Sequence, residues 1–185
     1  MREILMLLLA GVLADNLICF KTIGIGNNVL ATDTLRGSAI FGSAIAVLGV
    51  ITTAVIYPIY KFIVIPLGIA CFKTLILVLI CGAAIFAGKK LLPWLFGGFS
   101  SSQGAVAFGT VMGICCICAE SKNWGFSVLS ALFYGIGLLL VLCIFFCARL
   151  SVKHSRVPQS LKGLPLDLII TAIIALVLYG WQGVA

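Results

Sequence analysis

The chain is a series of long apolar runs separated by short polar stretches. A helix needs about 20 apolar residues to cross a bilayer, because each residue advances it by about 1.5 Å. Six segments meet or approach that length: residues 3 to 32, 37 to 57, 62 to 88, 93 to 118, 124 to 148 and 164 to 184. The pattern predicts an all-α fold, an integral membrane six-helix bundle that forms a single transmembrane domain over residues 1-185.

The first and fourth segments contain residues that disfavour a continuous helix. The first includes 24-GIGNN-28, with Gly24 and Gly26 as the candidate half-helix break, and the fourth includes 97-GGFSSSQG-104. In lipid, backbone groups freed by such a break must find partners within the protein. Broken helices at matching positions of two halves are typical of inverted repeats. We therefore predict a 3+3 inverted repeat with broken helices 1 and 4, and halves covering approximately 1-92 and 93-185.

The composition agrees with a membrane protein and excludes most other classes. Hydrophobic residues make up 63% of the chain and charged residues 9%, whereas a soluble domain carries roughly 25% charged residues. The net charge of +7 comes from basic residues that stand one or two at a time between apolar runs. Because there is no basic face with interleaved aromatic residues, nucleic acid is not an expected partner.

The basic residues of the loops predict the orientation of the bundle. Three basic residues fall on one side of the predicted segments, namely Arg2, Lys61 and Lys122. Seven fall on the other side, namely Arg36, Lys89, Lys90, Arg149, Lys153, Arg156 and Lys162. Cytoplasmic loops carry an excess of Lys and Arg. We therefore expect a multi-pass protein of the cell inner (plasma) membrane, with its N- and C-termini outside.

Three of the eight cysteines lie within five residues, in the run 114-ICCIC-118. They could be metal ligands, reactive thiols or small apolar residues in a helix. Adjacent helical residues point about 100° apart, so all three thiols cannot converge on one site. Four other cysteines lie in or beside apolar runs, and we interpret them as small buried hydrophobic residues; they are Cys71, Cys81, Cys143 and Cys147.

A few charged residues lie within or beside the apolar segments. Asp15 falls near the middle of the first segment, and an intramembrane carboxylate is a functional-site candidate by default. Alternatively, a neutral or Lys21-paired Asp15 stabilises the broken helix. Lys73 is a third ion-path candidate, although packing or snorkelling is the simpler role for it. Asp167 lies in the first turn of the sixth segment, where acids are favoured by the helix dipole.

Four stretches in order along the chain resemble the membrane subunits of the Rnf and sodium-pumping NADH:quinone oxidoreductase complexes, in the RnfA/NqrE branch. The stretches are 15-DNLICFKTIGIG-26, 64-VIPLGIACFKTLILVL-79, 130-SALFYGIG-137 and 157-VPQSLKGLPLDLIITAIIALVLYGWQGV-184. The resemblance implies half-helices that meet in the middle of the membrane. It also implies a homologous membrane subunit of opposite topology as partner, with flavin and ferredoxin-like subunits in the same complex.

The resemblance further implies a [2Fe–2S] cluster in the middle of the bilayer, held by two cysteines from each of two homologous subunits. Thiolates are the ligands that such clusters require. The family's second cysteine motif aligns with 113-GICCICA-119, so Cys116 or Cys115 takes the ligand position. The first motif aligns with 20-FKTIGIG-26, which places Gly26 where the other ligand is expected. Cys19 is the nearest thiol, seven residues earlier and about 10 Å away along a helix.

The resemblance therefore implies a membrane subunit of an electron-transport complex that moves Na⁺ or H⁺. Two alternatives stay open because Gly26 replaces a ligand. One is a small inverted-repeat transporter or channel without a redox centre. The other is a structural subunit of such a complex that has lost the cluster. No nucleophile–base pair or phosphate-binding loop appears in the chain, so no catalytic site of its own is predicted.

Overall fold

The computed structural model describes residues 26, 34–65, 73–91, 101–119, 121, 123–153, 158 and 161–182. Over these residues the regular structure is helical, with no strand. The elements are α3 (Leu35–Ile59), η2 (Tyr60–Val64), α4 (Lys73–Leu91), α6 (Ser101–Cys118), α7 (Trp124–Lys153) and α8 (Leu164–Gln182). The expectation of an all-helical fold is confirmed for this part of the chain.

Two of these helices are long and apolar enough to cross a membrane on length and composition alone. They span Leu35–Phe62 and Trp124–Val152. Three shorter apolar helices accompany them, over Thr74–Gly88, Ser102–Cys118 and Leu164–Gly180. The predicted first segment lies outside the described residues apart from Gly26, so the six-helix count and the inverted repeat stay predictions.

The helix α3 begins at a capped residue and changes its pitch after a proline. Thr34 caps the start of α3, where its Oγ1 accepts a hydrogen bond from the Gly37 amide at 3.1 Å. Pro58 lies inside the helix and cannot donate a backbone hydrogen bond. The chain then widens into the π-helical turn η2, where the Ile65 amide bonds the Tyr60 carbonyl at 3.1 Å. The helical stretch that starts with α3 therefore runs past the predicted end at residue 57.

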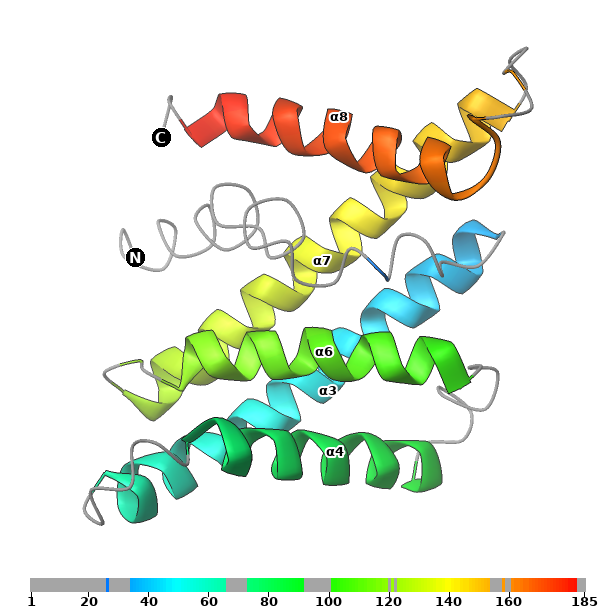
Figure 1. Cartoon of the computed structure of the whole chain (residues 1–185). Helices are drawn as coiled ribbons and strands as arrows, with labels where there is room; N and C mark the ends of the chain where they lie inside the picture. Colours follow the sequence, from blue (N-terminus) through cyan, green and yellow to red (C-terminus); the bar gives the residue numbers. More distant parts are fainter. Residues whose placement is uncertain are drawn as a thin grey trace.

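The helices α3 and α7 form the centre of the structure, packed side by side and antiparallel (Figure 1). Small residues allow this close approach, as is common between membrane helices. A Cβ atom built on Gly135 of α7 would lie 2.7 Å from the Ala46 Cβ atom of α3. On the other helix, a Cβ atom on Gly42 would lie 3.3 Å from the Leu139 Cα atom. The two backbones are therefore nearly in contact at these glycines.

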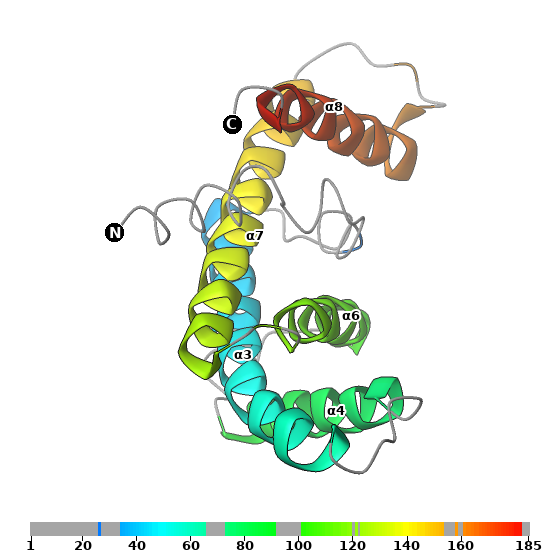
Figure 2. The same cartoon turned by 90° about the vertical axis from the view of Figure 1, so that its left-hand side faces the viewer.

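The remaining helices pack against this central pair. In the view of Figure 2, α4 and α6 lie on the same side of α3 and α7. The helix α6 contacts α3, α4 and α7, while α8 contacts α7. One buried apolar cluster includes residues from α3, α4, α6, α7 and α8, with Phe41 and Phe145 among its largest fully buried side chains. This core positions α6, which carries the cysteine run.

One predicted boundary is corrected by the structure. The third segment was expected from residue 62, but residues 60–64 form η2 and α4 begins at Lys73. The second half of the polar run 97-GGFSSSQG-104 is helical and belongs to α6 (Ser101–Cys118). The first half of this run lies outside the described residues.

Candidate functional site

The three cysteines of the ICCIC run face different surroundings on α6. Cys115 and Cys118 are buried, with exposed fractions of 0% and 1%, whereas Cys116 is exposed on the surface of the helix. The difference follows from the rotation of about 100° between neighbouring helical residues. The expectation that the three thiols cannot share one site is therefore confirmed.

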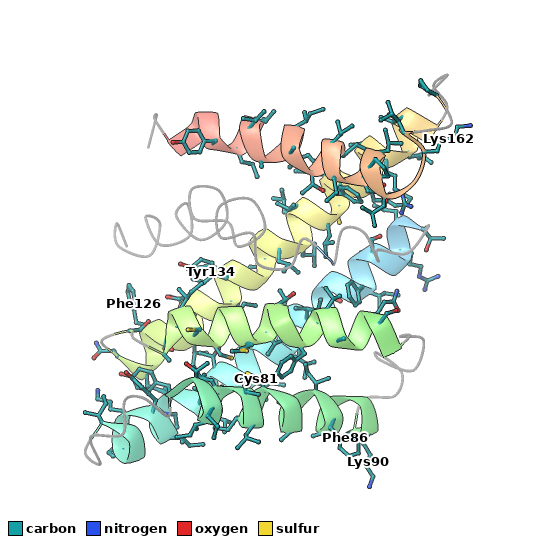
Figure 3. All side chains as sticks on the ribbon, in the orientation of Figure 1. Cys81, Phe86, Lys90, Phe126, Tyr134 and Lys162 are labelled. Carbon is teal, nitrogen blue, oxygen red and sulfur yellow. The ribbon has the colours of Figure 1, made fainter. Side chains whose placement is uncertain are left out.

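The buried Cys115 is surrounded by polar groups from two other helices. The Thr53 hydroxyl of α3 lies 3.5 Å from the Cys115 Sγ atom. The thiol of Cys81, on α4, lies beside the thiol of Cys115. Figure 3 labels Cys81 on the stretch of α4 that lies alongside α6. Both cysteines are fully buried, so this cluster of Thr53, Cys81 and Cys115 is enclosed within the protein.

The contact between Cys81 and Cys115 was not predicted from the sequence. The sequence interpretation of Cys81 as a small buried residue is confirmed, but it gave no sign of a neighbouring thiol. The two residues lie far apart in the chain, and only the packing of α4 against α6 brings them together. The same interpretation is wrong for Cys147, which is exposed on α7, and Cys143 is only partly buried. Cys71 lies outside the described residues.

Gly26, which stands at the expected position of the first cysteine ligand, packs against α6. Its backbone is helical, and a Cβ atom at this position would lie 2.9 Å from the Val106 Cγ1 atom and 3.2 Å from Cγ2. Val106 precedes Cys116 by ten residues in α6, or about 15 Å along a helix. Gly26 therefore contacts a different part of α6 from the part that carries Cys116.

The described residues fit a metal site that takes one thiolate ligand from the surface of this protein. They do not fit the two thiolate ligands per subunit that the sequence resemblance implies. Cys116 is the exposed thiol of α6, while residue 26 has no thiol and contacts Val106. Within the described part of the chain, no three His, Cys, Asp or Glu side chains are grouped closely enough to hold a metal ion. Among the three cysteines of α6, Cys116 is therefore the one on the surface, while the candidate ligand Cys19 lies outside the described residues.

Several predicted site residues lie outside the described residues, namely Asp15, Cys19, Lys21 and Gly24. Their roles as ion-path, ligand and half-helix-break candidates stay predictions. Lys73 is the first residue of α4, and its side chain is not described. Gly26 itself is helical, and its neighbours lie outside the described residues, so its role as a break also stays a prediction.

An ion pair joins α7 to the start of α8. The Arg149 Nε atom lies 3.1 Å from the Asp167 Oδ1 atom, and the exposed fractions of the two side chains are 31% and 5%. Asp167 lies in the first turn of α8, as the sequence predicted. The sequence did not identify Arg149 as its partner, because the two residues lie on different helices. The carboxylate is therefore stabilised by a cation as well as by its place at a helix start.

The Gly26 contact predicts that a cysteine at this position would destabilise the protein. Gly26→Cys should lower the free energy of unfolding by about 1 to 3 kcal/mol, because the added side chain overpacks against the stiff β-branched Val106. Gly26→Cys combined with Val106→Ala should recover most of that loss. Gly109→Cys on α6 is the matched control, because a Cβ atom there meets nothing within 4 Å. Thermal unfolding in detergent measures all three, and equal stability of Gly26→Cys and wild type would contradict the contact.

Comparisons with known proteins agree with the resemblance noted in the sequence. Residues 4–185 match the family model described as "Rnf-Nqr subunit, membrane protein". One relative, a subunit of the proton-translocating ferredoxin:NAD(+) oxidoreductase complex of Clostridium ljungdahlii, is 22% identical over 189 residues. Two others are subunits of ion-translocating oxidoreductase complexes, 23% identical over 192 residues in Edwardsiella ictaluri and 24% identical over 192 residues in Aeromonas hydrophila. Each alignment covers 99% of this chain and 98% of the relative.

Proposed function

This chain belongs to the Rnf-Nqr family of membrane subunits, and from that membership we propose that it is part of an ion-translocating electron-transport complex. The supporting observation is the match over nearly the full length to relatives named as subunits of such complexes. One of these relatives is named proton-translocating and the others ion-translocating. The transported ion is H⁺ or Na⁺.

In this proposal the chain works with other subunits rather than alone. Its partners are a homologous membrane subunit of opposite topology and subunits that carry flavin and ferredoxin-like centres. It lies in the inner (plasma) membrane as a multi-pass protein with both termini outside. The orientation is supported by the excess of loop cations on one side of the predicted segments.

Cys116 is the residue of this chain that we propose as a metal ligand at the contact with the partner subunit. Its thiol is exposed, so a metal centre bound there can also receive ligands from a second protein. Cys115 is a poorer candidate, because it is fully buried against Cys81 and Thr53. A [2Fe–2S] cluster would supply one-electron transfer across the apolar interior, where the low dielectric also helps to set its potential.

A second candidate function is a subunit of the same complex that holds no cluster. The packing of Gly26 against Val106 favours this candidate, because it leaves no room at residue 26 for the expected ligand. The buried Thr53, Cys81 and Cys115 then contribute to the packing of α3, α4 and α6. In this function the chain supports the assembly and the ion path, and the electrons pass through other subunits.

The iron content of the purified complex distinguishes these two functions. If Cys116 is a ligand, Cys116→Ser should abolish the paramagnetic signal of the reduced cluster and remove about two iron atoms per complex, the content of one [2Fe–2S] centre. Cys115→Ser should retain both, because this side chain is enclosed. Cys147→Ser is the matched control, since it removes an exposed thiol from α7 instead.

Each outcome has a defined meaning. Retention of the signal and the iron in Cys116→Ser would refute the ligand assignment. If Cys115→Ser abolishes the signal and Cys116→Ser does not, the buried cysteine is the ligand. Co-purification of the other subunits with each variant shows that the complex is still assembled. Failure of the wild-type chain to co-purify with any redox subunit would contradict the proposed function itself.

A further inference from the structure

A cavity lies between the end of α7 and the start of α8. Its volume is about 250 Å³, close to the lower end of the range for ligand pockets, roughly 300 Å³. Three of its lining residues are charged, namely Arg149, Lys162 and Asp167. Three others are large and apolar, namely Phe146, Leu150 and Leu166. The cavity therefore has a charged part and an apolar part.

The charged part of the cavity favours an anion. Asp167 is paired with Arg149 at 3.1 Å, so these two charges largely offset one another. Lys162 adds a second cation on the cavity wall and is exposed. Figure 3 labels Lys162 beside the turn that leads into α8. With two cations and one carboxylate, the cavity lining carries a net positive charge.

The apolar lining residues lie next to the charged ones along both helices. Phe146 precedes Arg149 by one helical turn in α7, about 4.5 Å along the axis and away from the end of the helix at Lys153. Leu166 follows Lys162 inside α8. A phospholipid offers the matching combination, a charged headgroup joined to apolar acyl chains.

We propose that this cavity binds the headgroup of an anionic phospholipid. The phosphate would lie beside Lys162 and Arg149, and the start of the acyl chains would contact Phe146, Leu150 and Leu166. Basic pockets between transmembrane helices are known to bind anionic headgroups. The site is independent of the cysteine run, because it involves α7 and α8 and not α6.

Native mass spectrometry of the full chain in a neutral detergent can test this proposal. The probes are phosphatidylglycerol and phosphatidylcholine with identical acyl chains. The wild-type chain should bind phosphatidylglycerol more tightly. Lys162→Ala should weaken phosphatidylglycerol binding about fivefold, the factor expected for one basic residue near a membrane surface, and should leave phosphatidylcholine binding unchanged.

Lys90→Ala is the matched control. Lys90 is also an exposed lysine, and it lies near the end of α4, at the opposite end of the molecule from Lys162 (Figure 3). This variant should bind phosphatidylglycerol as the wild type does. If the two variants lose equal affinity, binding reflects general surface charge and the proposed site is wrong.

Two further measurements complete the test. Inorganic phosphate should not displace phosphatidylglycerol, because it lacks the apolar part that Phe146 and Leu166 contact; full displacement would show a site for a free anion instead. Leu150→Asn changes an exposed apolar wall residue and should weaken phosphatidylglycerol binding without altering the melting temperature in detergent. Equal binding of the two lipids by the wild-type chain would overturn the proposal.

Discussion

Replacing Gly135 with alanine is expected to lower the free energy of unfolding by about 2 to 3 kcal/mol, near the upper end of the usual cost of overpacking. The added Cβ atom would lie 2.7 Å from the Ala46 Cβ atom and 3.0 Å from the Ala46 Cα atom. The second of these contacts is with the backbone of α3, which cannot rotate away as a side chain can. The helices α3 and α7 would have to move apart at the centre of the fold.

Gly125→Ala is the matched control, because Gly125 lies in the same helix and a Cβ atom there meets nothing within 4 Å. Alanine is favoured over glycine in a helix by about 1 kcal/mol, so this variant should be neutral or slightly stabilised. Thermal unfolding in detergent gives both values. Similar changes of the same sign in the two variants would contradict the close contact between α3 and α7.

Adding Ala46→Gly to the Gly135→Ala variant should restore part of the lost stability. The second change removes the Cβ atom at 2.7 Å, but the Ala46 Cα atom at 3.0 Å stays in place. Recovery should therefore be incomplete. Absence of any recovery would mean that the two positions are not coupled.

Arg149→Gln is expected to destabilise the protein by about 2 to 4 kcal/mol, because it leaves the carboxylate of Asp167 buried without its cation. This loss of stability is smaller than the full cost of breaking a buried ion pair. The Arg149 side chain is 31% exposed, so water screens part of its attraction to Asp167. The start of α8 should separate from α7 in this variant. Stability is best measured in neutral detergent, so that lipid binding at the adjacent cavity does not contribute.

Asp167→Asn should cost less, about 1 kcal/mol, the value of a typical hydrogen bond. The arginine that remains can reach water, whereas the Asp167 side chain is only 5% exposed. The double variant should be more stable than Arg149→Gln alone, because no charge is left buried. Arg36→Gln, which changes an exposed arginine at the start of α3, should have little effect. A larger loss for Asp167→Asn than for Arg149→Gln would contradict this account.

The sequence predicted most of the helices within the described residues. The second, fifth and sixth segments were expected at 37 to 57, 124 to 148 and 164 to 184, and the structure has α3, α7 and α8 at nearly these positions. These segments are continuous apolar runs, and hydropathy depends only on the residues within each run. The predicted start of the third segment at residue 62 was wrong, because the apolar residues 60–64 continue from α3 as η2.

The candidate site was predicted only in part. The resemblance selected Cys115 and Cys116 from eight cysteines, and the angle between neighbouring helical residues implied that the two thiols would differ. Which of them is exposed could not be predicted, because it depends on the side of α6 that faces the core. The apolar residues of α6 do not define one clear face, so hydropathy could not orient this helix.

By itself, the sequence determined that this is a helical membrane protein, which segments form α3, α7 and α8, and which family it resembles. These properties follow from the chemistry of each residue and its near neighbours in the chain. Only the tertiary structure decided that Cys81 meets Cys115, that Arg149 pairs with Asp167 and that Gly26 packs against Val106. The physical reason is that each of these contacts joins different segments. Contacts of this kind arise only when helices pack at a particular distance and rotation, and the apolar pattern of a single segment fixes neither.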